Sequence, residues 1–133
     1  MTSRRFHHTG FVVAAIEPVI EGFQKSLGLP WDGQIIHDPL QDVWVAFLGP
    51  PDGPFVELVA PASSTSPVQK VLTKGGGLHH LCYEVSSLTQ TLEESRALGN
   101  LLVRAPLPAV AFGGRHIAWV YTRQKLLLEF LEL

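Results

Sequence analysis

Two histidines and two glutamates stand out because each interrupts an otherwise apolar stretch. His8 and His80 each end a His-His pair, and Glu57 and Glu129 lie inside the apolar runs 55–59 and 126–131. An ionised carboxylate on a buried strand is costly unless it is paired or bound to a metal ion. Two imidazoles and two carboxylates suit a divalent ion such as zinc, nickel, cobalt, manganese or iron(II). We therefore expect His8, Glu57, His80 and Glu129 to bind one metal ion, whose identity stays open.

The spacing of these four residues indicates an internal repeat. His8 and His80 are 80 − 8 = 72 residues apart, and Glu57 and Glu129 are 129 − 57 = 72 residues apart. Between them, Val45-Ala46-Phe47 corresponds to Ile117-Ala118-Trp119 at the same offset. Repeated supersecondary units stack or pair to bury a common core. Two modules related in this way would bring the four candidate ligands toward a common centre.

Each half of the chain has the pattern strand, helix and three strands. A helix is predicted over 17–27, with Pro18 in its first turn and Gly28 at its end. A second helix is predicted over 88–98, with Ser86 or Ser87 as its N-cap and Gly99 at its end. Alternating or apolar runs predict the strands, which are expected near 6–13, 34–37, 43–48 and 54–59 in the first half and near 79–85, 101–104, 115–121 and 126–132 in the second.

The predicted fold is therefore α+β, with two tandem βαβββ modules forming a curved, barrel-like mixed β-sheet with flanking helices. We expect a single domain over 1–133, with modules at about 5–61 and 78–133 and a linker at about 61–77. The three glycines at 75–77 allow a sharp turn into the second module. A phosphate-binding glycine loop is the rival interpretation, but no Lys-Ser/Thr pair follows and a strand comes next.

Composition limits the partners. A formal net charge of −2 with scattered basic residues gives no reason to expect nucleic acid or an anionic membrane. No stretch has about 18 uninterrupted apolar residues, so no membrane span is expected. Cys82 is the only cysteine, which rules out an intrachain disulfide and favours a reducing, cytoplasmic location.

The four candidate ligands and their surroundings resemble a known family. Val56-Glu57-Leu58-Val59, Gly77-Leu78-His79-His80 and Leu128-Glu129-Phe130 make the chain similar to the vicinal oxygen chelate superfamily, which includes glyoxalase I, methylmalonyl-CoA epimerase, extradiol dioxygenases and bleomycin-resistance proteins. The Gly-Leu-His-His stretch and the turn at Gly113-Gly114 look most like the epimerase.

This resemblance implies a metal-dependent isomerase or lyase that stabilises an enolate of a carbonyl or thioester substrate. It implies that Glu129 or Glu57 doubles as metal ligand and base, and that the protein is a homodimer. One departure matters: epimerases of this family carry a glutamate base on the third strand of the first module, where this chain has Val45. The substrate therefore stays open between epimerase-like and glyoxalase I-like chemistry.

Two alternatives use the same fold. A binding protein of the antibiotic-sequestering kind would have lost its ligands, and here all four are present. An iron(II) ring-cleaving dioxygenase would use two histidines and one glutamate, which is a poorer match.

Further candidates follow from strand alternation. Arg115, Trp119 and Tyr121 share the ligand face of their strand and are candidates for binding substrate. Cys82 is expected to be a buried small residue. Alternation counted from His8 and His80 places His7 and His79 on the opposite strand face.

Overall fold

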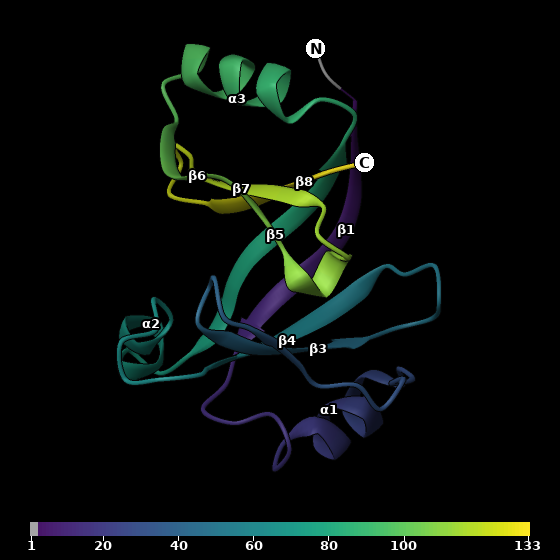
Figure 1. The fold of residues 1–133 in the computed structure, drawn as a ribbon. Helices are drawn as coiled ribbons and strands as arrows, with labels where there is room; N and C mark the ends of the chain where they lie inside the picture. The colour runs from purple at the N-terminus through teal and green to yellow at the C-terminus, as the bar shows by residue number, and fades with distance from the viewer. Residues whose placement is uncertain (1–2) are drawn as a thin grey trace. The chain divides into compact units, whose positions relative to one another are not determined.

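The computed structural model describes residues 3–133 and confirms the predicted α+β class (Figure 1). Two pairs of strands, β1 with β4 and β5 with β8, run parallel, and the other recorded pairs are antiparallel, so the sheet is mixed. The strand order is β2-β3-β4-β1-β5-β8-β7-β6. In chain order the elements are β1 (Arg4–Val12), α1 (Ile20–Leu27), β2 (Ile36–Asp38), β3 (Val43–Leu48), β4 (Phe55–Pro61), α2 (Gln69–Thr73), β5 (Gly77–Val85), α3 (Leu88–Ala97), β6 (Leu101–Pro108), the 3-10 turn η1 (Val110–Phe112), β7 (His116–Tyr121) and β8 (Leu127–Glu132).

The chain forms two compact units. The first unit comprises His8–His79, and the second comprises residues 3–7 together with His80–Leu133. Strands β1 and β5 each contribute residues to both units. Within residues 3–133, no helix is long and apolar enough to cross a membrane.

In the first unit, α1 covers a core on one side of β3 and β4. Ile16 and Ile20 pack there with Ala46, Leu48 and Leu58. Helix α1 begins at Ile20, three residues later than predicted, because Pro18 lies in the preceding turn and the amides of Val19 and Ile20 both donate to the carbonyl of Ile16. It ends as predicted at Gly28, whose φ of 66° is left-handed and therefore suits glycine.

In the second unit, apolar residues pack on both faces of the strands. Val85, Leu88, Ala118, Val120 and Phe130 form one cluster, which includes the first residue of α3. On the other face, near η1, is a second cluster formed by Cys82, Ala109, Ile117 and Leu131. Cys82 is fully buried, as predicted.

The segment between the two predicted modules contains a short helix, α2, that the sequence analysis does not predict. It is followed by Gly75, Gly76 and Gly77, all with positive φ (110°, 70° and 96°), which confirms the predicted turn. A Cβ on Gly76 would lie 2.7 Å from the carbonyl oxygen of Val12. Only glycine fits this approach without a backbone shift.

Candidate metal centre

The first unit holds two of the four predicted ligands, His8 and Glu57, as a close pair. Nε2 of His8 lies 3.3 Å from Oε1 of Glu57, and both residues are buried. The parallel register of β1 and β4 pairs Gly10 with Glu57, and His8 lies two residues before Gly10, so its side chain shares the face of Gly10. The pairing of these two strands thus brings an imidazole and a carboxylate together.

The second unit repeats this arrangement at an offset of 72 residues. Nε2 of His80 lies 3.4 Å from Oε1 of Glu129, and both residues are again buried. The register of β5 and β8 pairs Cys82 with Glu129, which is the counterpart of the Gly10–Glu57 pairing. The repeat seen in the sequence is therefore a repeat of site geometry as well.

In each pair, the distance between the imidazole nitrogen and the carboxylate oxygen fits two atoms bound to the same metal ion. An N–H···O hydrogen bond usually measures about 2.7–3.2 Å, which is shorter than either pair. Two atoms bonded to one ion at about 2.1 Å, at tetrahedral or octahedral angles, lie about 3.0–3.4 Å apart. An imidazole nitrogen and a carboxylate oxygen are also donors that zinc and related divalent ions accept. Each pair by itself therefore has the chemistry and spacing of two ligands on one ion.

An aromatic ring packs edge-on against the imidazole of each pair. The Phe47 ring lies 5.6 Å from that of His8, and the Trp119 ring lies 4.7 Å from that of His80. The sheet register pairs Phe47 with Glu57 and Trp119 with Glu129. Both rings therefore line the face of the sheet that carries the neighbouring glutamate.

The predicted substrate-binding residues all lie in the second unit. Trp119 is half-buried beside His80, and Tyr121, two residues further along β7, is 39% exposed. Arg115 precedes β7 and makes two hydrogen bonds, from Nε to the carbonyl of Glu132 and from Nη2 to Oε2 of Glu84, each 2.9 Å long. Substrate binding by these three residues stays a prediction.

Glu84 is a residue that the sequence analysis misses. Its carboxylate is buried and lies 3.2 Å from Nε of Arg5, in addition to its bond with Arg115. Burial, the strongest influence, raises the pKa of Glu84, but the hydrogen bond from Arg115 and the charges of His7, Arg5 and Arg115 outweigh it and hold the pKa below its usual value. The signal was available, because Glu84 interrupts an apolar strand much as Glu57 does.

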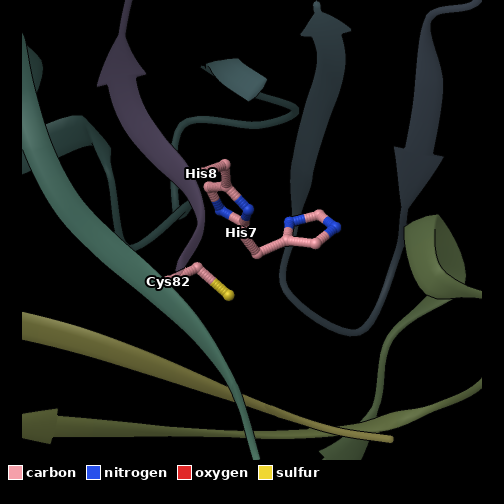
Figure 2. Close-up of side chains that lie close together, drawn as sticks. All are labelled: His7, His8 and Cys82. Carbon is pink, nitrogen blue, oxygen red and sulfur yellow. The ribbon is translucent and has the colours of Figure 1, made fainter. Parts of the chain in front are cut away.

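His7 also lies differently from the prediction. Its ring packs edge-on against Phe112, 5.4 Å away, and Phe112 packs against the cluster that contains Cys82 and Ile117. A ring nitrogen of His7 and the sulfur of Cys82 lie within 4.8 Å of each other (Figure 2). The prediction of the opposite face is therefore wrong for His7, whose ring lies on the Cys82 side of the strands, and for His79 it stays a prediction.

Comparison with known proteins places the chain in a family. The sequence model described as the glyoxalase/bleomycin resistance protein/dioxygenase superfamily matches residues 7–119. The chain belongs to this superfamily. The family predicted from the four candidate ligands and their surroundings is thereby confirmed.

The relatives within the superfamily include epimerases. The chain is 25% identical over 121 residues to the ethylmalonyl-CoA/methylmalonyl-CoA epimerase of Cereibacter sphaeroides, covering 90% of this chain and 89% of that protein. The crystal structure of methylmalonyl-CoA epimerase from Mycobacterium tuberculosis is 26% identical, with a TM-score of 0.77 and coverage of 96% and 86% of the two chains. A hypothetical protein from Bacillus halodurans, BH1468, is 30% identical with a TM-score of 0.86 and coverage of 98% and 95%. The predicted likeness to methylmalonyl-CoA epimerase is confirmed at this level of identity.

This superfamily member carries two buried apolar residues beside its two His–Glu pairs. Val45 is 4% exposed and lies two residues before Phe47, on the face that carries Glu57. Ile117 is fully buried and has the same relation to Trp119 and Glu129. Neither position offers a group that can move a proton, so any such group must come from elsewhere in the site.

Proposed function

We propose that the protein is a metal-dependent isomerase of the methylmalonyl-CoA epimerase type, which moves a proton at the carbon next to the carbonyl of a small acyl thioester. The observation that carries the proposal is the pair of equivalent, buried His–Glu contacts, with Nε2–Oε1 distances of 3.3 and 3.4 Å. The epimerase relatives at 25% and 26% identity support the thioester class.

In this proposal His8, Glu57, His80 and Glu129 together hold one divalent ion. When bound, the ion would supply Lewis-acid polarisation of the substrate's carbonyl oxygen. Glu129 or Glu57 takes the proton from the α-carbon, since a carboxylate within reach of that proton can act as general base, and a proton delivered to the opposite face of the enolate completes the isomerisation. Phe47 and Trp119 exclude water around these carboxylates, which strengthens the electrostatic interactions there. Trp119, Tyr121 and Arg115 contact the rest of the substrate.

The test is exchange of the α-proton with heavy water. Metal-loaded protein would be incubated in deuterium oxide with methylmalonyl-CoA, other 2-methyl-3-oxo thioesters or a glutathione hemithioacetal, and mass spectrometry would follow deuterium incorporation. We expect incorporation into at least one thioester. A Glu129→Gln variant should lose it by about a hundredfold or more, which is the usual scale of general base catalysis.

Glu93→Gln is the matched control, because Glu93 is exposed on α3 and the substitution has the same chemistry. It should exchange the proton as fast as the unmodified protein. Absence of exchange with every carbonyl substrate, under conditions where metal analysis shows bound ion, would contradict the proposed reaction and favour a binding role.

We also propose that the protein acts as a homodimer. Strand β6 lies at one end of the strand order, and its residues Leu101, Leu102 and Val103 are 67%, 54% and 57% exposed. An exposed apolar edge strand is a surface that proteins usually cover. Light scattering at micromolar concentration should give twice the mass of one chain, and Val103→Lys should shift the population toward the monomer. A monomeric mass for the unmodified protein would refute the proposal.

A further inference from the structure

Glu84 and two arginines form a charged cluster within the second unit. Oε2 of Glu84 accepts a hydrogen bond from Nη2 of Arg115 at 2.9 Å, and Oε1 lies 3.2 Å from Nε of Arg5. The Glu84 side chain is 7% exposed, whereas the side chains of Arg115 and Arg5 are 36% and 77% exposed. The carboxylate is thus buried beneath two guanidinium groups that reach the surface.

The repeat shows that the fold does not need this ion pair. Glu84 corresponds to Val12, since 84 − 12 = 72, and Arg115 corresponds to Val43, since 115 − 43 = 72. Val12 and Val43 are both buried, so the first unit builds the same positions from apolar side chains. Placing charges where apolar residues suffice costs desolvation energy and seldom adds net stability. The cluster therefore calls for an explanation other than folding.

Its position relates it to the candidate metal ligands of the same unit. His80, Cys82 and Glu84 alternate along β5 and share one face. Glu84 lies four positions after His80 along β5, which corresponds to about 13 Å. Arg115, Ile117 and Trp119 follow one another at two-residue intervals, so they too share one face. Trp119 packs against His80. The cluster and the His80–Glu129 pair therefore lie along one face at a separation comparable to the length of an extended small molecule.

The charges and donors of the cluster favour an anion. Two guanidinium groups and one carboxylate leave one net positive charge. A guanidinium has five N–H donors, and the hydrogen bonds recorded for Arg115 within residues 3–133 use two of them. Because the bonds to Glu84 and to the Glu132 carbonyl fix the plane of the group, its remaining donors are oriented before a ligand arrives.

We propose that Arg115 and Arg5 bind an oxyanion, a phosphate or carboxylate, at the end of the substrate remote from its reacting carbonyl, and that Glu84 is the positioning residue for Arg115. This inference rests on the proposed function, which places the reacting carbonyl of the substrate at the candidate metal ligands. It adds to that function a substrate with an anionic group that binds beside Glu84, about 13 Å along β5 from His80.

The test uses the double variant Glu84→Val/Arg115→Val, which copies the apolar pair of the first unit. The variant has the same net charge as the unmodified protein and should stay folded, as urea denaturation would check. Isothermal titration of chelator-treated protein would use two probes, coenzyme A for the phosphate source and malonate for the carboxylate source. We expect the unmodified protein to bind at least one probe, and the variant to bind it about tenfold more weakly, as loss of charge-assisted hydrogen bonds predicts. Glu84→Gln alone should give a smaller loss.

The turnover assay separates binding from chemistry. In proton exchange the double variant should raise KM with little change in kcat, because Arg115 contacts the remote end of the substrate. A loss confined to coenzyme A identifies a phosphate, and a loss confined to malonate identifies a carboxylate. If neither probe binds the unmodified protein, or if the folded double variant binds both as tightly, the proposal is refuted. Anion binding that depends on Arg115 in a protein without proton exchange would refute the proposed reaction and leave the anion site standing.

Discussion

Val45 stands where the resemblance to methylmalonyl-CoA epimerase implies a glutamate base. It is buried on the face of Glu57 and Phe47, where a carboxylate would be within the same apolar surroundings as the candidate ligands. A reaction that takes a proton from one face of a carbon and returns it to the other needs an acid or base on each side. With valine here, the second acid or base that epimerisation needs must come from elsewhere in the site, so we expect epimerisation of methylmalonyl-CoA to be slower than exchange of its α-proton.

A Val45→Glu variant tests this interpretation. We expect it to increase epimerisation of methylmalonyl-CoA by about tenfold or more, since a positioned general acid or base contributes at least that much. The variant should also be less stable, by about 2 kcal/mol, because a polar group is buried. Chiral analysis of the product and urea denaturation would measure the two effects.

Val45→Gln is the control for this substitution, because glutamine has the same size but cannot carry the proton. It should show the loss of stability without the gain in rate. Equal rates for the glutamate and glutamine variants would contradict a catalytic role for this position.

Glu84 makes a prediction about pH. Its pKa is held below the usual value by Arg115, His7 and Arg5 despite the opposing effect of burial. A carboxylate whose pKa is lower in the folded than in the unfolded protein stabilises the fold above its unfolded pKa and loses that contribution as the pH falls through the folded value. Glu84→Gln should therefore reduce stability at neutral pH by about 1–3 kcal/mol. The difference from the unmodified protein should shrink as the pH falls from 6 toward 3.

Urea denaturation at a series of pH values would measure this difference. Subtracting the two proteins isolates Glu84, because all other groups titrate in both. A difference that stays constant with pH would mean that the charge of Glu84 contributes nothing to stability.

At the scale of elements, helix α3 begins with a cap that the sequence leaves open between two serines. The structure decides for Ser87, whose Oγ accepts a hydrogen bond from the amide of Gln90 at 3.2 Å. Ser87→Ala should destabilise the protein by about 1 kcal/mol, because an amide of the first turn loses its partner. Urea denaturation would measure the effect, with the exposed neighbour Ser86 changed to alanine as the control. Equal effects of the two substitutions would contradict the assignment of the cap.

The bounds of the strands and helices show which elements a local sequence pattern can predict. Strand β3 has the predicted bounds 43–48, because apolar residues and clear turn clusters delimit it. Helix α2 is missed because it has only five residues, none of them buried, and so leaves no apolar periodicity. Strand β6 continues to Pro108, beyond the predicted 104, since pairing with β7 carries it through register shifts that no local pattern encodes.

In the candidate site, too, local sequence patterns predict some features, whereas others depend on how the strands pair. The four predicted ligands lie as two buried His–Glu pairs, one in each unit, and the 72-residue repeat of polar residues in apolar strands is the sequence signal that singles them out. The Glu84–Arg115 contact joins residues 31 apart through the pairing of three strands. Such a contact depends on register, so the sequence indicates the buried glutamate but not its partners.

For the whole molecule, the decisive question is whether the two equivalent pairs act as one site. Each pair alone offers two ligands, which hold a divalent ion weakly, whereas four ligands match the number usual in protein metal sites. If the pairs share one ion, loss of a ligand in either unit removes the same site. If they do not, each pair should bind an ion of its own and respond only to changes in its own unit.

We therefore predict one ion per chain and strong coupling between the two units. Metal analysis after dialysis against zinc, cobalt or manganese should give a ratio near one, and His8→Ala should abolish binding as completely as His80→Ala does. Because a ligand that binds only the folded state stabilises it, ion removal by a chelator should lower the melting temperature of the unmodified protein. The same treatment should leave both variants unchanged. His37→Ala, which removes an exposed histidine stacked on Trp44, is the control and should retain the ion. A ratio of two ions per chain, or binding that survives the loss of one histidine at half its capacity, would show two independent sites and refute the shared centre on which the proposed reaction depends.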